Sequence, residues 1–225
     1  MKIELLHNTP LHICSTAIRK CWASEDKSDS YSFGESSFQM GEKDKALIDK
    51  VGNKNKHSST LEHLNYTFDI DGISRACLQE LARHRHASLS VKSTRYTLKE
   101  LKEEPTFYNY SKVVPREMES RAEKYLVKTP NDNVNIMSVQ ALELLRVVLN
   151  DGVSNDIAKY TLPEAYKTSL VWTINARSLQ NFLTLRTSPS ALWEIRELAY
   201  AIYKQLPIEH KYLFHDSLYV RREDD

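Results

Sequence analysis

Glycine is scarce in this chain, and its scarcity limits the folds that the sequence can adopt. Five glycines are spread over 225 residues, and no two of them have the spacing of G-x-G-x-x-G or G-x-x-x-x-G-K. Those motifs build the backbone cradles that hold phosphates in dinucleotide-binding folds and P-loop folds. If the chain binds a nucleotide or a flavin, cationic side chains must therefore replace a glycine-rich loop.

Composition excludes several classes of protein. Lys and Arg total 31 against 30 Asp and Glu, and 41% of the residues are hydrophobic. Balanced charge disfavours a protein that coats nucleic acid or an anionic membrane, and the apolar content excludes wholesale disorder. No apolar run approaches the roughly 18 residues of a membrane span, and no signal peptide pattern is present. Three cysteines without a CxxC pair indicate reduced thiols, so we expect a cytoplasmic protein, and no residue set has metal-ligand spacing.

Strand and helix patterns alternate irregularly along the chain. Periodicity predicts strands at 1–6, 64–70 and 168–174, an exposed connection at 20–42, and helices at 43–52, 73–85, 112–128, 134–150, 176–187 and 190–206. Asp71-Gly72 is expected to end the second strand. Because regular βαβ units are absent, the pattern favours an α+β fold, within the broad α/β class.

Positive charge concentrates in residues 81–99, which hold five Lys and Arg, two His and no acid. The Arg83-His84-Arg85 triplet lies at the predicted C-terminal end of a helix, where the helix dipole favours cations. That structural interpretation is the default one for such a triplet. Serines and threonines interleave with the cations, however, and this mixture suits phosphate and carbonyl oxygens.

Three blocks of the sequence resemble the flavin-dependent thymidylate synthases, in that family's order. Arg83-His84-Arg85, seven residues and then Ser93 resemble the RHR-x7-S signature. Residues 57–63 resemble the H-x-[ST]-x-x-E-H segment, and residues 172–186 resemble the W-T-x-N-A-R-S-L-x-N-F-L-x-L-R block. The resemblance implies one domain over residues 1–225, with a mostly antiparallel sheet flanked by helices. It also implies a homotetramer with sites at subunit interfaces.

The same resemblance implies a reaction and its residues. The family methylates dUMP to dTMP, with FAD as hydride carrier, methylenetetrahydrofolate as carbon donor and NADPH as reductant. The implied flavin contacts are His57, Ser59, Glu62, Arg83, His84, Arg85, Asn175, Arg177 and Asn181. The implied dUMP contacts are Glu80, Arg83, Ser93, Thr94, Arg95, Lys159 and Arg186, of which Arg186 is the catalytic one. Lys159 stands where the family commonly has arginine, which keeps the charge but not the two-pronged fork.

Helical spacing gives a second reason, independent of the resemblance, to single out Arg186. It lies four residues after Phe182 and three after Leu183, so a continuous helix places all three on one apolar face. A half-buried arginine needs an anionic or carbonyl partner, since an unpaired buried charge is costly. The alternative is a cation at a helix C-terminus or a structural ion pair.

Structural alternatives also stand beside the other motif residues. Asn175 could cap a helix, Arg177 to Asn181 could form a solvated face, and His57 with Glu62 could make ordinary hydrogen bonds at a strand entry. Two other functions remain open as well. One is a nucleic-acid-binding module that uses the basic segment, and the other is a non-catalytic regulator that binds a flavin or nucleotide.

Overall fold

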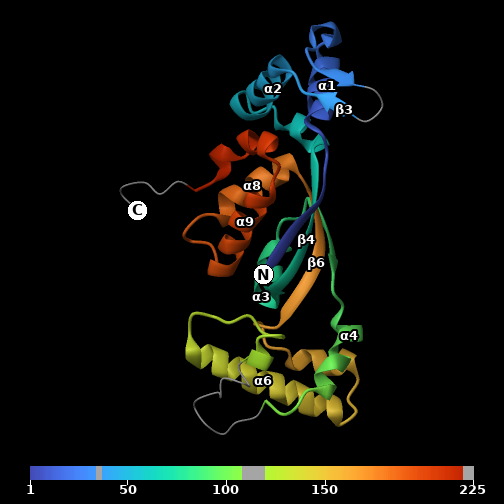
Figure 1. The fold of residues 1–225 in the computed structure, drawn as a ribbon. Coiled ribbons are helices and arrows are strands. Elements are labelled where there is room, and N and C mark those ends of the chain that lie inside the picture. The colour runs from blue at the N-terminus through green and yellow to red at the C-terminus, as the bar shows by residue number, and fades with distance from the viewer. Residues whose placement is uncertain (34–36, 108–119, 220–225) are drawn as a thin grey trace. The chain divides into compact units, whose positions relative to one another are not determined.

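The computed structural model describes residues 1–33, 37–107 and 120–219 (Figure 1). Its strands are β1 (Lys2–Asn8), β2 (Tyr31–Phe33), β3 (Ser37–Gln39), β4 (Asn65–Ser74), β5 (Ala87–Val91) and β6 (Lys167–Asn175). Its α-helices are α1 (Leu11–Cys21), α2 (Glu42–Ile48), α3 (Arg75–Leu81), α4 (Thr94–Thr97), α6 (Asp132–Asn150), α7 (Asn155–Ala158), α8 (Ala176–Arg186) and α9 (Trp193–Gln205). Shorter helical turns are η1 (Glu25–Lys27), the π-helical η2 (Asp49–Lys54), η3 (Ser58–His63), η4 (Leu98–Glu103), η5 (Lys159–Thr161), η6 (Ile208–Leu213) and η7 (His215–Ser217).

A four-stranded sheet has the order β1-β4-β6-β5. Ala176 donates its amide to the carbonyl of Leu64 (2.7 Å), and Arg75 donates to Tyr166 (3.0 Å), so β4 and β6 run antiparallel. The residue that follows β1 donates to the first residue of β4 (2.9 Å), and the residue that follows β5 donates to the start of β6 (2.8 Å). Each neighbouring pair is therefore antiparallel, which confirms the predicted α+β fold.

The described chain forms two compact units. Unit 1 comprises residues 1–2, 70–82 and 90–170, and unit 2 comprises residues 3–69, 83–89 and 171–225. Strands β4 and β6 each contribute residues to both units. The single domain expected over residues 1–225 stays a prediction.

Unit 1 is built on one face of α6, whose buried leucines pack with residues of η4 and with Phe107. Glu143 on α6 is 5% exposed, and its carboxylate accepts hydrogen bonds from the Phe107 amide (2.9 Å) and the Arg146 guanidinium (2.7 Å). Burial raises the pKa of Glu143, but the hydrogen bonds outweigh burial and hold that pKa below its usual value. This carboxylate therefore ties the segment before α6 to the helix.

Unit 2 has an aromatic core beneath α8. Trp172 on β6 lies edge-on to Phe182 on α8, with ring centroids 5.0 Å apart, and it also contacts Phe68 on β4. All three side chains are fully buried. Helix α8 packs against α9 and against η3 (Figure 1). The last motif block thus begins in the core of unit 2 and continues to its surface.

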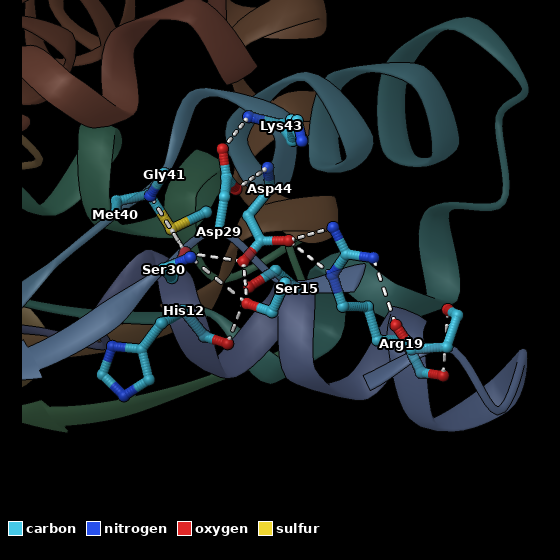
Figure 2. A network of polar contacts seen from close by, with 11 residues as sticks. His12, Ser15, Arg19, Asp29, Ser30, Met40, Gly41, Lys43 and Asp44 are labelled. Atoms are coloured by element: carbon cyan, nitrogen blue, oxygen red, sulfur yellow. Dashed lines mark hydrogen bonds and ion pairs between the residues drawn. The ribbon is translucent and has the colours of Figure 1, made fainter. Parts of the chain in front are cut away.

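A buried ion pair in unit 2 joins α1 to α2 (Figure 2). The Arg19 guanidinium on α1 contacts the Asp44 carboxylate on α2, and their side chains are 9% and 1% exposed. Ser28 (2.5 Å) and Ser30 (2.6 Å) donate to the same carboxylate. Burial raises the pKa of Asp44, but the hydrogen bonds and Arg19 outweigh burial, so the pKa lies below its ordinary value. The amide of Gly41 then donates to Ser30 (2.9 Å), which fixes both ends of the β2–β3 hairpin.

The observed elements depart from the predicted ones in the first half of the chain. Residues 20–42 were expected as an exposed connection, but they contain η1 and the antiparallel β2–β3 hairpin. Helix α1 was not predicted. Residues 112–119 of the helix expected at 112–128 lie outside the described residues, and only residues 120–122 of the remainder are helical.

The region around the basic triplet also differs. The strand expected to end at Asp71-Gly72 continues to Ser74, because Gly72 takes a positive φ of 80° within it. The following helix ends at Leu81, and Ala82 is its C-cap. The triplet at 83–85 therefore follows the helix instead of lying in its last turn, and it leads into β5, which was not predicted.

Candidate functional site

A cleft of about 570 Å³ opens on the surface of unit 2. Its lining comes from the end of η3, the loop after α3 and one face of α8: Glu62, Arg83, His84, Arg85, His86, Asn175, Arg177, Ser178, Asn181, Leu185 and Arg186. All three motif blocks of the sequence therefore contribute to one cleft. It holds four arginines and one carboxylate, so its electrostatic field favours an anionic ligand.

The triplet alternates between the surface and the interior. Arg83 and Arg85 are exposed, whereas His84 between them is buried, at 9% exposure. The triplet lies in the turn and loop between α3 and β5. Both exposed arginines line the cleft, and the histidine between them contributes to the same lining from a buried position.

Arg186 at the end of α8 is half-buried and is hydrogen-bonded to that histidine. Its Nε donates to Nε2 of His84 at 3.0 Å. The His84 ring lies edge-on to Phe182, with centroids 5.0 Å apart. The predicted apolar face shared by Phe182, Leu183 and Arg186 is confirmed. The partner of Arg186 in this hydrogen bond is an imidazole nitrogen, whereas an anionic or carbonyl partner was expected from the sequence.

The first turn of α8 is at the cleft. Asn175 is the N-cap, because its side-chain oxygen accepts from the Ser178 amide at 2.9 Å. Helix capping was the structural alternative for Asn175, and the structure confirms it. The same residue also lines the cleft. The positive end of the helix dipole adds to the charge of the arginines there.

Arg177, two residues into that helix, forms an ion pair with Glu62 of η3 (2.7 Å). Both side chains are about half exposed, so the pair contributes little to stability. It does join the first and third motif blocks directly. The alternative for Glu62 was an ordinary hydrogen bond, and its contact with Arg177 is one. Both residues of this pair line the cleft.

Other predicted residues lie away from this lining. His57 and Ser59 are exposed at the start of η3 and are not among the described residues that line the cleft. The remaining predicted dUMP contacts lie in unit 1: Glu80 on α3, Ser93 at the N-cap of α4, Thr94 and Arg95 within α4, and Lys159 at the start of η5. Arg95 forms an ion pair with Asp156 of α7 (2.7 Å).

Three residues of the cleft lining were missed by the sequence argument. His86 directly follows the triplet, and Ser178 lies inside the last motif block, so proximity to the motifs could have indicated both. Leu185 is an ordinary helical leucine with no chemical signal in the sequence.

A family model described as "Thymidylate synthase complementing protein" matches residues 4–209. The chain is 61% identical over 214 residues to a flavin-dependent thymidylate synthase of Wolinella succinogenes, covering 95% of this chain and 97% of that protein. The chain belongs to the flavin-dependent thymidylate synthase family. A member from Campylobacter jejuni is 59% identical over 219 residues, covering 97% of this chain and 98% of that protein.

Solved structures of this family also match. The crystal structure of thymidylate synthase X from Helicobacter pylori with FAD and dUMP has a TM-score of 0.87 at 54% identity, covering 97% of this chain and 99% of that one. A second structure of the Helicobacter pylori enzyme, also complexed with FAD and dUMP, has a TM-score of 0.88 at 53% identity, covering 97% and 100%. The fold of the family is thus the fold of this chain. Within the described residues, no helix has the length and apolar character to cross a membrane.

Proposed function

We propose that this chain is a flavin-dependent thymidylate synthase that methylates dUMP to dTMP. The observation that carries the proposal is the arginine-lined cleft of unit 2, where all three motif blocks of the family meet. Each ligand of the reaction is anionic, and the cleft supplies cations in place of a glycine-rich phosphate loop.

The residues of the cleft fit a flavin nucleotide. A volume of about 570 Å³ lies within the range of small-molecule sites. Glu62, Arg83, His84, Arg85, Asn175, Arg177 and Asn181 would hold FAD there, and His57 and Ser59 are proposed as further contacts from the start of η3. When bound, FAD supplies the hydride that completes the methyl group.

The proposed contacts to dUMP are Glu80, Arg83, Ser93, Thr94, Arg95, Lys159 and Arg186. The cationic residues among them suit the phosphate of the nucleotide. Arg186 would stabilise the negative charge that develops on the uracil ring as C5 becomes nucleophilic. Ser93 would position the nucleotide and would not act as a covalent nucleophile.

The cysteines support a route without an enzyme thiolate. Cys14 and Cys77 are fully buried, and burial raises the pKa of Cys14 to about 12. A thiol with so high a pKa is protonated at neutral pH and is a poor nucleophile. Cys21 is exposed and lies on α1, outside the described lining of the cleft.

Family membership supports proposals for the co-substrates and the assembly, and the cysteines support one for the location. We propose methylenetetrahydrofolate as the carbon donor and NADPH as the reductant. We also propose a homotetramer with sites at subunit interfaces, in which residues 1–225 act as one domain. Three free thiols are typical of a reducing compartment, which supports a cytoplasmic location.

Two measurements on the purified protein test this function. The protein is expected to be yellow, with flavin absorbance that bleaches when NADPH is added without oxygen. With methylenetetrahydrofolate present, it should release tritium from 5-tritiated dUMP and form dTMP. A flavoprotein that bleaches but releases no tritium would be the non-catalytic regulator. A colourless protein whose RNA or DNA affinity falls steeply with salt would be the nucleic-acid-binding module.

A further inference from the structure

We infer that His84 is a positioning residue, whose imidazole sets the direction in which the Arg186 guanidinium faces within the cleft. The inference rests on the proposed function, in which Arg186 acts on the uracil of dUMP. It assigns His84 a task beyond a contact to the flavin. The observation behind it is the hydrogen bond of 3.0 Å from Arg186 Nε to His84 Nε2.

A single hydrogen bond at Nε can orient an arginine because the guanidinium is planar and rigid. Its five N–H donors lie in fixed directions in one plane: the Nε–H shares one edge with a single terminal N–H, and the two terminal nitrogens together form another edge. When Nε–H is directed at His84, the plane and the terminal edge of the group are set as well. Arginine side chains otherwise have many rotamers, and ordering them costs free energy when a ligand binds.

His84 can serve this purpose only if its own ring is fixed, and the core of unit 2 fixes it. The ring is 9% exposed and lies edge-on to Phe182, which is fully buried against Trp172. Phe182 is also four residues before Arg186 on α8, so the two side chains lie on one face of the helix. His84 therefore contacts that face at both positions, packing on one side chain and accepting from the other.

The direction of the hydrogen bond fixes the protonation state of the imidazole. Arginine has no acceptor, so Nε2 must carry the lone pair and the ring must be neutral, with its proton on Nδ1. A neutral imidazole orients Arg186 without adding a negative charge that would offset the cation. A carboxylate at the same place would orient the arginine and also weaken its attraction for an anionic substrate.

Two substitutions at this position separate the packing role from the acceptor role. His84→Phe keeps a ring that can pack on Phe182 but removes the acceptor. His84→Gln loses the aromatic packing but places an amide oxygen at about the reach of Nε2. We expect His84→Phe to lower kcat for dTMP formation by about 10- to 100-fold, since small misplacements of a reacting group have effects of this size. We expect His84→Gln to retain most of kcat although its melting temperature falls.

The reverse order would overturn the inference. If the role of His84 is only structural, His84→Phe keeps kcat and His84→Gln loses it in step with stability. Combining His84→Phe with Arg186→Lys gives a further check, because lysine has no Nε–H group for His84 to hold. In the Arg186→Lys background, His84→Phe should change kcat less than threefold. Independent, multiplicative effects of the two substitutions would contradict a shared role.

A spectroscopic readout keeps the test separate from the proposed function. In the wild-type protein labelled with ¹⁵N-histidine and ¹⁵N-arginine, the His84 ring should show a protonated Nδ1 and an unprotonated Nε2. The Arg186 Nε–H should give a slowly exchanging signal that His84→Phe removes and His84→Gln retains. If the wild type forms no dTMP, the proposed function fails, and the inference is then decided by these signals together with dUMP titrations. Wild-type dUMP affinity and an unchanged Arg186 signal in His84→Phe would refute the inference.

Discussion

At the scale of single residues, the arginines predicted to bind the ligands differ in the groups that they contact. Carboxylates hold Arg177 and Arg95, through ion pairs of 2.7 Å to Glu62 and Asp156. Arg186 donates its Nε–H to the imidazole Nε2 of His84, and this hydrogen bond orients the guanidinium. The charge-stabilising step is proposed for Arg186, which lines the cleft and whose guanidinium is oriented by His84.

Arg186→Ala is therefore expected to fold, to bind FAD and to fail in the chemical step. Removing one preorganised donor of this kind typically lowers the rate by about 100- to 1,000-fold. Arg186→Lys should recover only part of the loss, since a point charge cannot reproduce a planar fork. Melting temperature, flavin content and dTMP formation should be measured on the same preparations. A lower melting temperature with near-normal turnover would instead support the structural role of a helix-end cation.

Residue-scale prediction worked where chemistry and spacing coincided. Phe182 and Arg186 share a face because helical periodicity is a local property, and it could be predicted from their spacing. The partner of Arg186 could not, because His84 is 102 residues away and its position depends on how the loop after α3 folds. The pairing of Glu62 with Arg177, 115 residues apart, is non-local in the same way.

At the scale of elements, α8 combines a structural cap with a position in the cleft, and Asn175 has both tasks. Asn175→Ala removes the acceptor for the Ser178 amide and should lower the free energy of unfolding by about 1 kcal/mol. Asn175→Asp keeps an acceptor, and its charge is favoured at the positive end of the helix. Asn175→Asp should therefore keep wild-type stability but bind flavin more weakly, because it adds a negative charge to the cleft. Urea unfolding and flavin titration of both variants measure the two effects separately. Equal flavin affinity in wild type and Asn175→Asp would show that Asn175 is not part of the flavin site.

The ion pair between α1 and α2 supports the cleft through η3, which packs on α1, η2 and α8. Asp44→Asn leaves the buried Arg19 charge without its partner and should cost about 3 kcal/mol of stability. Because the folded pKa of Asp44 lies below its ordinary value of 3.8, its ionised form stabilises the protein fully above that value. This contribution is lost as pH falls through the folded pKa.

The stability difference between wild type and Asp44→Asn should therefore be largest near neutral pH and shrink below about pH 4. Urea midpoints at several pH values measure it. Glu25→Gln is the matched control, since its solvent-exposed pair with Lys20 should contribute little to stability. A difference that stayed constant down to pH 2 would show that Asp44 does not stabilise the fold as a carboxylate.

Element-scale prediction succeeded for long periodic segments and failed for short polar ones. The helix expected at 134–150 is α6 at Asp132–Asn150, and the strand expected at 168–174 is β6 at Lys167–Asn175. The hairpin strands β2 and β3 have three residues each, and the contacts of Ser28 and Ser30 with Asp44 fix their position. Strand β5 is a serine-rich edge strand with little apolar alternation. The β2–β3 hairpin and β5 therefore depend on tertiary contacts, which a local sequence pattern does not contain.

At the scale of the whole molecule, α6 is apolar on two opposite faces. Leu142, Leu145 and Leu149 are buried in unit 1, while Met137, Leu144 and Val147 are 40–64% exposed. A helix that is hydrophobic on both faces is typical of one covered on both. The homotetramer proposed above would supply a cover for the outer face. The exposed face of α6 is therefore expected to pack against another copy of this chain.

Leu144→Glu tests this expectation, because it places a carboxylate in the middle of the apolar face. Burying an unpaired charge is costly, and symmetry would repeat the cost in each copy, so the assembly should dissociate into smaller species. Light scattering after size-exclusion chromatography should give four times the 26.1 kDa chain mass for wild type and a lower mass for Leu144→Glu. Asn150→Glu is the control, since it adds the same charge at the exposed end of α6, away from the apolar face.

If the sites are shared between subunits, the dissociated variant should also lose bound flavin while its far-UV circular dichroism stays that of the wild type. A Leu144→Glu protein that keeps the wild-type mass would show that this face does not hold the assembly together, and one that dissociates with full flavin content would place the flavin site within a single subunit.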